Sequence, residues 1–187
     1  MSHLTIFRHC ATSKTANQPI LKSAVPDEIK NYLAERGIGF ERWPAKVDLG
    51  KNASSTEILA AYSQEIAATQ TKGDYPVVDA IRVTPDHPDR IALRQKFLAE
   101  HIHAENEVRF FVEGRGLFCL HVNDEVLQVL CEQDDWISVP AGTKHWFDMG
   151  ENPNFSAIRF FNNPDGWVAE FTGDQIATGY PLLEVDN

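Results

Sequence analysis

Three histidines and one glutamate stand at spacings that could hold a metal ion. His101, His103 and Glu107 lie in one segment, and His145 follows a Pro-Ala-Gly-Thr-Lys stretch downstream. Because successive side chains of a strand point to opposite faces, the first three can converge on one point if their segment is extended. Neutral imidazoles and a carboxylate suit a divalent first-row metal such as iron, nickel, manganese or zinc. Four such ligands on a six-coordinate ion leave two positions open, which indicates a redox or Lewis-acid enzyme.

The same residues must also be considered without a metal. A single histidine on an apolar strand is more often a hydrogen-bonded core residue than a ligand. Here, however, several ionisable groups would be buried together without a partner, which costs several kcal/mol unless something compensates. A metal ion is the simplest compensation. Glu105 has the same parity as Glu107, so the spacing leaves both carboxylates as possible ligands.

The composition is ordinary for a globular protein. The chain has 187 residues, of which 43% are hydrophobic and 24% are charged, enough for one domain with a sizeable core. A net charge of −10 argues against a nucleic-acid partner. No apolar run approaches the ~20 residues that span a bilayer, so no membrane partner is expected.

The cysteines and the first residues predict a cytoplasmic location. Cys10, Cys119 and Cys131 are odd in number and form no Cys-x-x-Cys pair, which argues against a disulfide framework. Cys119 and Cys131 lie in apolar, strand-like runs and are expected to be small buried residues. The start of the sequence lacks the pattern of a secretory signal.

The first half of the chain predicts helices that precede the candidate metal ligands. We expect a helix over 26–37, with Pro26 in its first turn and Gly37 as its stop. A second helix over about 54–68 would start at Ser54 or Ser55, and a third over 89–98 would lead into the ligands. An alternating, β-branched segment over 75–83 predicts a strand.

The second half predicts a β barrel. Turn signals recur every eight to twelve residues from His101 onward, a pattern typical of all-β sandwiches and barrels. Strands are expected over 107–112, 116–122, 125–132, 136–139, 145–149, 156–161 and 168–172, with turns at 114–116 and 122–124. We therefore expect one mainly β domain (α+β) over 1–187. It would comprise a helix-containing part over 1–98 and a double-stranded β-helix barrel, mainly 99–175, with the ligands inside.

Two motifs resemble those of the cupin superfamily. The first is His101-x-His103-x-x-x-Glu107 followed by Gly114, and the second is Pro140-x-Gly142-x-x-His145. The chain departs from the usual pattern because Gln95 and Asp134 replace the leading glycines and Met149 stands where Asn is common.

A longer stretch resembles one cupin family, the acireductone dioxygenases. The resemblance covers most of the chain from about Tyr75 to Tyr180, and more loosely the helical first half. It is carried by Glu100-His-Ile-His103, Glu107-Val-Arg-Phe-Phe-Val-Glu-Gly114, Gly116-Leu-Phe-Cys-Leu-His121 and Lys144-His-Trp-Phe-Asp-Met-Gly150, and it continues through Asn154-Phe155, Ile158-Arg159 and Gly166-Trp167.

The resemblance implies a metal-dependent dioxygenase of methionine salvage. Its substrate would be the acireductone 1,2-dihydroxy-3-oxo-5-(methylthio)pent-1-ene, cleaved with O₂. With Fe(II) the products would be formate and 2-oxo-4-(methylthio)butanoate; with Ni(II) they would be formate, carbon monoxide and 3-(methylthio)propanoate. One ion per chain is implied, and the smaller members of the family suggest a monomer. The ligands are the same for both metals, so the sequence does not choose between them.

The resemblance also assigns roles to residues around the metal. The ligands would be His101, His103, Glu107 and His145. Arg109, two residues beyond Glu107, would stabilise the negative charge of the substrate. The alternative role for Arg109 is an ordinary salt bridge at the rim of the barrel.

Two neighbours of the ligands have weaker assignments. Glu100 would help metal loading, although it could equally be a solvated acid at a helix end. Asn106 stands where an Asp is common in relatives, which puts that acid's role as a conformational relay in doubt here.

Four further residues would shape the substrate pocket. Phe97, Phe147 and Trp167 match aromatic residues that receive the methylthioalkyl tail, and Arg159 matches an arginine near the pocket. Aromatic residues in a barrel are usually core, and an arginine on a late strand can be an ordinary ion pair.

Two other functions remain possible at this point. The chain could be another cupin enzyme, with the same metal site and a different substrate pocket. It could also be a non-catalytic protein that binds a metal or small ligand. Glu107 and Arg109 argue against the second function, because a purely structural site has little use for a buried cation.

Overall fold

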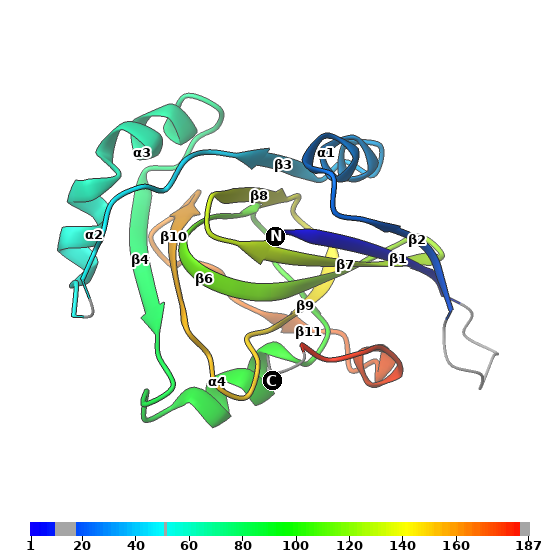
Figure 1. The fold of residues 1–187 in the computed structure, drawn as a ribbon. Coiled ribbons are helices and arrows are strands. Elements are labelled where there is room, and N and C mark those ends of the chain that lie inside the picture. The colour runs from blue at the N-terminus through cyan, green and yellow to red at the C-terminus, as the bar shows by residue number, and fades with distance from the viewer. Residues whose placement is uncertain (10–17, 51, 184–187) are drawn as a thin grey trace.

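Two antiparallel sheets share one long strand and form the body of the molecule. The computed structural model describes residues 1–9, 18–50 and 52–183, so Cys10 lies outside the described residues (Figure 1). The strands are β1 (His3–Arg8), β2 (Pro19–Ser23), β3 (Gly39–Arg42), β4 (Val77–Val83), β5 (His101–Ile102), β6 (Glu107–Val122), β7 (Glu125–Glu132), β8 (Asp135–Val139), β9 (Lys144–Asp148), β10 (Phe155–Phe161) and β11 (Glu170–Phe171). One sheet has the order β11-β5-β9-β6-β7-β1-β2, and the other has the order β4-β10-β6-β8-β3. The predicted mainly β fold with N-terminal helices is confirmed.

Strand β6 links the two sheets. The sequence predicted two strands with a turn at 114–116, and this prediction is wrong: β6 runs without a break through 16 residues. Its first half pairs with β8 and β10, and its second half pairs with β7 and β9. Gly114 has a φ of +66°, and the register to β10 shifts opposite this region, between Ser156 and Ala157. Gly114 and Gly116, which predicted a turn from the sequence, therefore lie at a bend within β6. The strand continues through them because β10 pairs with it before the bend and β7 pairs with it after the bend.

Strands β1, β2 and β3 were not predicted from the sequence. β1 pairs with β7 and β2, and β3 pairs with β8, so the first 98 residues contribute strands to both sheets. β1 buries Leu4 and Ile6 and exposes His3 and Arg8. β2 begins with Pro19 and lies at the edge of its sheet, where a missing backbone N–H is tolerated.

Four α-helices occur in the described residues, and they lie outside the sheets (Figure 1). α1 (Pro26–Ala34) ends before Gly37, whose φ is +78°, as its stop signal predicts. The single helix predicted over 54–68 is instead two helices, α2 (Ser55–Ala61) and α3 (Ser63–Gln70), which break at Tyr62 (φ −115°, ψ 30°). This break buries the Tyr62 ring edge-on against Phe110 at 5.7 Å, so tertiary packing overrides the helical pattern.

The remaining helix features agree with the sequence. Ser54 and Glu57 form the predicted capping box at the start of α2. α4 (Arg90–Phe97) leads into the candidate ligands, as expected. None of the helices in the described part of the chain is long and apolar enough to span a membrane.

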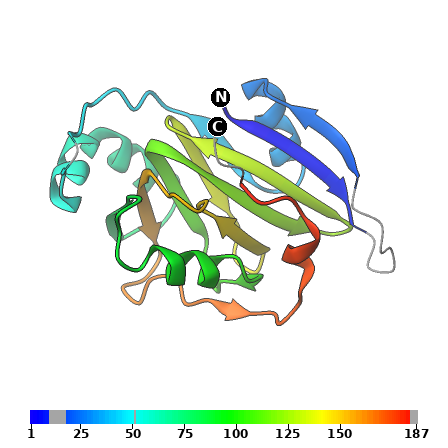
Figure 2. The same cartoon turned by 60° about the horizontal axis from the view of Figure 1, so that its bottom comes forward.

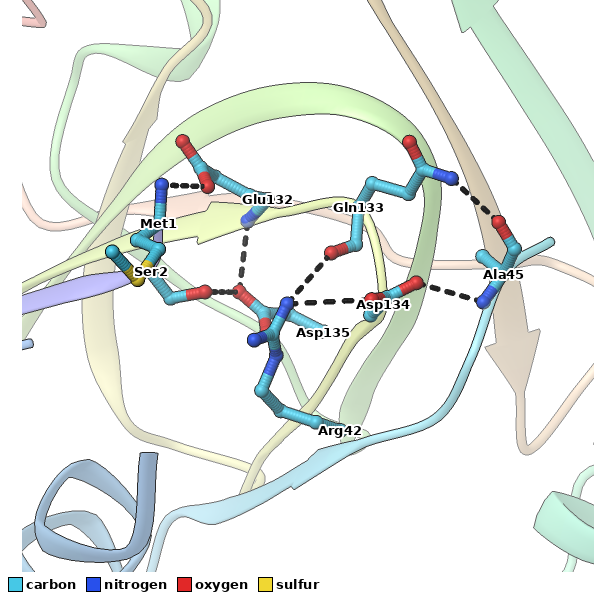
Figure 3. Close-up of polar contacts among 8 residues, drawn as sticks. All are labelled: Met1, Ser2, Arg42, Ala45, Glu132, Gln133, Asp134 and Asp135. Carbon is cyan, nitrogen blue, oxygen red and sulfur yellow. Dashed lines mark hydrogen bonds and ion pairs between the residues drawn. The ribbon is translucent and has the colours of Figure 1, made fainter. Parts of the chain in front are cut away.

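A buried polar cluster ties the start of β1 to the turn between β7 and β8 (Figure 3). The carboxylate of Asp135 is fully buried and accepts hydrogen bonds from Ser2 Oγ at 2.5 Å, from Glu132 N at 2.8 Å and from Arg42 Nε at 2.9 Å. Burial raises the pKa of Asp135 to about 6, because these three donors only partly offset the loss of solvation.

Candidate metal centre

Three imidazoles meet inside the barrel. His101 on β5 pairs directly with His145 on β9, and His103 follows β5 by one residue. One ring nitrogen from each histidine lies within 4.8 Å of the others. The three residues are 5%, 2% and 6% exposed in the order His101, His145 and His103, so their rings are almost completely shielded from solvent.

Backbone carbonyls orient each of these rings. Nδ1 lies 2.8 Å from Ala99 O in His101, 3.0 Å from Val168 O in His103 and 2.8 Å from Thr143 O in His145. A carbonyl oxygen can only accept, so each Nδ1 donates its hydrogen, and the lone pair of each neutral ring is on Nε2. Such a bond is the usual way in which proteins fix a histidine ligand.

The ligand segment is not the single extended strand that the spacing argument assumed. β5 ends at Ile102, the chain bends at Ala104 and Glu105, and β6 begins at Glu107. This bend separates the two candidate acids. Glu105 accepts a hydrogen bond from Asn163 Nδ2 at 2.6 Å, whereas Glu107 faces the histidines.

Glu107 connects the histidines to a buried cation. Its Oε2 lies 2.9 Å from His145 Nε2 and 3.2 Å from His103 Nε2, and its Oε1 accepts from Arg109 Nε at 2.7 Å. Burial alone would raise the pKa of Glu107, but the Arg109 guanidinium and the imidazoles hold it well below its usual range. Arg109 is itself only 6% exposed, so its salt bridge with Glu107 lies inside the barrel and not at the rim.

The pKa values of the two histidines of the first motif are shifted in opposite directions. Burial, together with the neighbouring His145, lowers the pKa of His101 to about 4, so this ring is neutral at pH 7. Burial also opposes the charge on His103, but the hydrogen bond and charge of Glu107 outweigh it and raise the pKa of His103 above 6.5. A proton and a metal ion would therefore compete at His103.

The four predicted pocket residues line one cavity beside the histidines. The cavity has a volume of about 410 Å³, and Phe97, Phe147, Arg159 and Trp167 are part of its wall. Figure 2 brings forward α4 and β11, which supply Phe97 and Phe171 to this wall. The guanidinium of Arg109 lies 5.0 Å from the ring centre of Phe147 and 5.2 Å from that of Trp167.

Strand β4 supplies wall residues that the sequence reasoning missed. Val77, Asp79 and Ile81 line the cavity, and Asp79 holds Arg159 through contacts of 2.8 Å and 2.6 Å. These three residues alternate along the predicted strand, so their side chains point to the same face. That alternation was the only feature of the sequence that could have indicated their place in the wall. Phe155 and Phe161 from β10 were also missed.

Glu100 and Asn106 do not line this cavity. Glu100 is 1% exposed and accepts hydrogen bonds from His121 Nδ1 at 2.8 Å and from Thr172 Oγ1 at 2.6 Å. Asn106 accepts from Ala141 N through its side chain and from Trp167 Nε1 through its carbonyl. His121 lies near the end of β6, and Cys119 and Cys131 are buried as expected.

The donor set fits a divalent metal ion. Three Nε2 atoms and one ionised carboxylate converge in a site with almost no exposure, and the carbonyl partners of Nδ1 already hold the rings in place. His101, His103 and His145 thus form a buried site for a metal.

Comparison with known proteins agrees with this chemistry. Residues 6–169 match the ARD/ARD' family. The chain belongs to this family. Acireductone dioxygenase from Prochlorococcus marinus (strain MIT 9313) is 64% identical over 184 residues, which cover 98% of this chain and 100% of the relative. Acireductone dioxygenase from Synechococcus sp. (strain RCC307) is 61% identical over 183 residues, covering 98% of this chain and 99% of the relative.

A solved structure of the family is also similar. Acireductone dioxygenase from Bacillus anthracis, solved with a cadmium ion in its active centre, has a TM-score of 0.78 and 29% sequence identity. The match covers 91% of this chain and 98% of that chain. The fold of a metal-containing family member is therefore present over nearly the whole molecule.

Proposed function

We propose that this chain is a metal-dependent dioxygenase of methionine salvage that cleaves acireductone, 1,2-dihydroxy-3-oxo-5-(methylthio)pent-1-ene, with O₂. The observation that carries the proposal is the convergence of three Nε2 atoms beside the Glu107–Arg109 pair, in the wall of a cavity that also has aromatic residues, in a member of the ARD/ARD' family. The resident ion would be Fe(II) or Ni(II), one per chain.

His101, His103, His145 and Glu107 would hold the ion. When bound, the ion supplies Lewis acidity for the substrate's enediolate oxygens and brings them into reach of O₂. Three neutral imidazoles and one carboxylate leave a divalent ion with a net charge of about +1, so the site favours an anionic substrate. A metal ion would bind the neutral form of His103, because only the neutral ring has a lone pair on Nε2.

Arg109 would hold the negative charge of the substrate. Its guanidinium is buried against Phe147 and Trp167 and is bonded to Glu107, so its position is set before substrate arrives. A fixed cation in a poorly solvated cavity stabilises negative charge more strongly than the same cation in water. It would also favour the second deprotonation of the enediol, because that step adds negative charge to the substrate.

The aromatic wall would receive the methylthioalkyl tail. Phe97, Phe147 and Trp167 offer apolar surface in the wall of the same cavity that the histidines line, and a sulfur-containing chain could pack on it. Arg159 is neutralised by Asp79 and would shape this wall through its contact with Trp167, 5.7 Å from guanidinium to ring centre.

Glu100 and Asn106 would act without touching the substrate. Their contacts with Thr172 and Trp167 join the ligand segment to the chain segment that covers it. We further propose that the enzyme works as a monomer in the cytoplasm.

Oxygen consumption tests the proposal directly. The full chain is stripped of metal, reloaded with Fe(II) and given the acireductone. Rapid metal-dependent O₂ uptake with release of formate is expected, and a repeat with Ni(II) and detection of carbon monoxide identifies the products formed with each metal. No uptake above the spontaneous oxidation of the substrate, with the metal shown to be bound, would reject this substrate and favour another cupin enzyme.

A further inference from the structure

We infer that His121 is a positioning residue for the metal site, acting through Glu100 on the adjacent ligand His101. The contact between them lies on the face of the sheet away from the cavity. This inference rests on the proposed function only in taking His101 as a metal ligand.

The strand that carries His101 has little backbone support. β5 is two residues long, with one residue pair to β9 and two to β11. β11 is also only two residues long and lies at the edge of the sheet. So few ladder hydrogen bonds would leave a short strand free to fray, and a frayed strand holds a ligand poorly.

A side-chain cluster supplies the missing support. Glu100 precedes His101 and accepts from His121 Nδ1 at 2.8 Å and from Thr172 Oγ1 at 2.6 Å, and its carbonyl accepts from Thr172 N at 3.1 Å. Thr172 follows β11, and His121 lies near the end of β6. This Glu100–His121–Thr172 clasp therefore joins β5 to both β11 and β6.

The clasp crosses over β9, the strand of the fourth ligand. β9 lies between β5 and β6, so the contact from Glu100 to His121 must pass over it. Cys119 lies two residues from His121 on β6, so both side chains point to the same face of the sheet. On that face Cys119 and Trp146 pack in an apolar cluster that is separate from the barrel interior. Phe118 and Phe147 point to the opposite face and pack in the interior. The clasp thus lies behind the ligands, and it does not reach the cavity.

Two of the three members of the clasp are shielded from solvent. Glu100 is 1% exposed, and the His121 side chain is 13% exposed. His9 packs against the His121 ring in a T-shaped arrangement, with ring centres 5.3 Å apart, and His9 Nδ1 lies 2.9 Å from the hydroxyl of Tyr180. A buried carboxylate that loses one of two side-chain donors must move toward another donor or water, and the backbone of Glu100 and His101 would move with it.

The test measures metal affinity instead of turnover. The full chain is stripped of metal and titrated with Ni²⁺ against a competing chelator, and the absorption spectrum of the Ni²⁺-loaded protein is recorded. His121→Phe keeps the ring against His9 and removes the donor to Glu100. We expect its Ni²⁺ affinity to fall about 10-fold, with an altered spectrum, which is the lower end of the range for loss of a direct partner of a ligand, because His121 acts on His101 only through Glu100.

Two matched variants separate positioning from general stability. His121→Asn keeps a donor near the place of Nδ1 and should restore Ni²⁺ affinity to within about threefold of the wild type. His9→Phe removes the contact with Tyr180 but no contact of Glu100, and should leave the affinity and the spectrum unchanged.

The inference is overturned if His121→Phe binds Ni²⁺ as tightly as the wild type, with the same spectrum. If that variant does not fold, the exposed Thr172→Val carries the test: a loss of about 3–10-fold supports the clasp, and no loss overturns it. Ni²⁺ affinity is independent of acireductone cleavage, so failure of the proposed function would not be mistaken for failure of the clasp.

Discussion

At the scale of single residues, the charge of the site depends on the pairing of Glu107 with Arg109. Glu107 touches two histidines through one oxygen and Arg109 through the other. In the proposed function, the same carboxylate would therefore serve a metal ion while it holds Arg109 in the wall of the cavity. Neither role requires any exposed charge, because both residues are buried.

The substitution Arg109→Met tests the role of that cation. We expect kcat for oxygen consumption to fall by roughly 10²-fold, because a fixed charge that stabilises an anionic transition state is lost. Metal content should stay at one ion per chain. Arg82→Met, which removes an ion pair with Glu113 away from the cavity, is the matched control. An Arg109→Met enzyme with wild-type kcat would contradict this role.

The substitution His103→Ala tests the ligand set. Loss of one of three converging imidazoles should lower Ni²⁺ affinity by more than about 100-fold and abolish turnover, while much of the fold is kept. Metal analysis of the purified variant, with circular dichroism as a check of folding, measures both effects. Stoichiometric metal together with full turnover would show that His103 is not a ligand.

At the scale of elements, the bend of β6 brings the two sheets together around the site. Gly114 allows this bend in two ways. Its φ of +66° is in the left-handed region, and a Cβ there would stand 1.8 Å from Asn154 O. Glycine is thus required both by backbone conformation and by a close approach of two chain segments.

Gly114→Ala should destabilise the protein by more than about 3 kcal/mol, because the backbone of Asn154 has to move. Gly37→Ala is the matched control: its φ is +78°, but nothing lies within 4 Å of the added Cβ. It should cost only about 1 kcal/mol, from the left-handed conformation alone. Urea unfolding of both variants measures the difference, and equal losses would mean that the approach to Asn154 is unimportant.

Elements also position the cavity wall. Arg94 of α4 forms two hydrogen bonds, of 2.8 Å and 3.1 Å, with the fully buried Asp148 at the end of β9. This pair links the helix that carries Phe97 to the strand that carries His145 and Phe147. One wall of the cavity and one metal ligand therefore share a support.

At the scale of the molecule, N-terminal strands complete both sheets. β1 extends the sheet that contains β5 and β9, and β3 and β4 form the two edges of the other sheet. We therefore propose that residues 1–187 fold as one domain. The Asp135 cluster joins the start of this domain to its centre (Figure 3).

Asp135 predicts a pH-dependent stability. Its pKa is about 6 in the folded chain and near 3.8 when unperturbed, so the folded state binds this proton more tightly. The resulting stabilisation, about 2–3 kcal/mol, is fully present below about pH 4 and is lost as the pH rises through about 6. An asparagine side chain does not titrate, so Asp135→Asn lacks this pH-dependent contribution to stability.

The difference in Tm between wild type and Asp135→Asn should therefore shrink, or change sign, as the pH rises from about 4.5 to 7. Thermal unfolding of both proteins at a series of pH values provides the measurement. A difference that does not vary with pH would show that Asp135 keeps the same charge in the folded and unfolded chain.

The amino-acid sequence by itself determined the chemistry of the site and much of the local structure. His101, His103 and His145 were identified because few other residue types bind a transition metal, and the Ser54–Glu57 capping box and the Gly37 stop depend only on neighbours along the chain. Only the tertiary structure turned Glu105 toward Asn163 and Glu107 toward the histidines, made β6 one strand, divided the predicted helix at Tyr62 and brought β4 to the cavity. Each of these outcomes depends on partners far away in sequence, such as Asn163, Ser156, Phe110 and Arg159. Contacts of that kind leave no periodic pattern in the chain, because either alternative satisfies the local rules equally well.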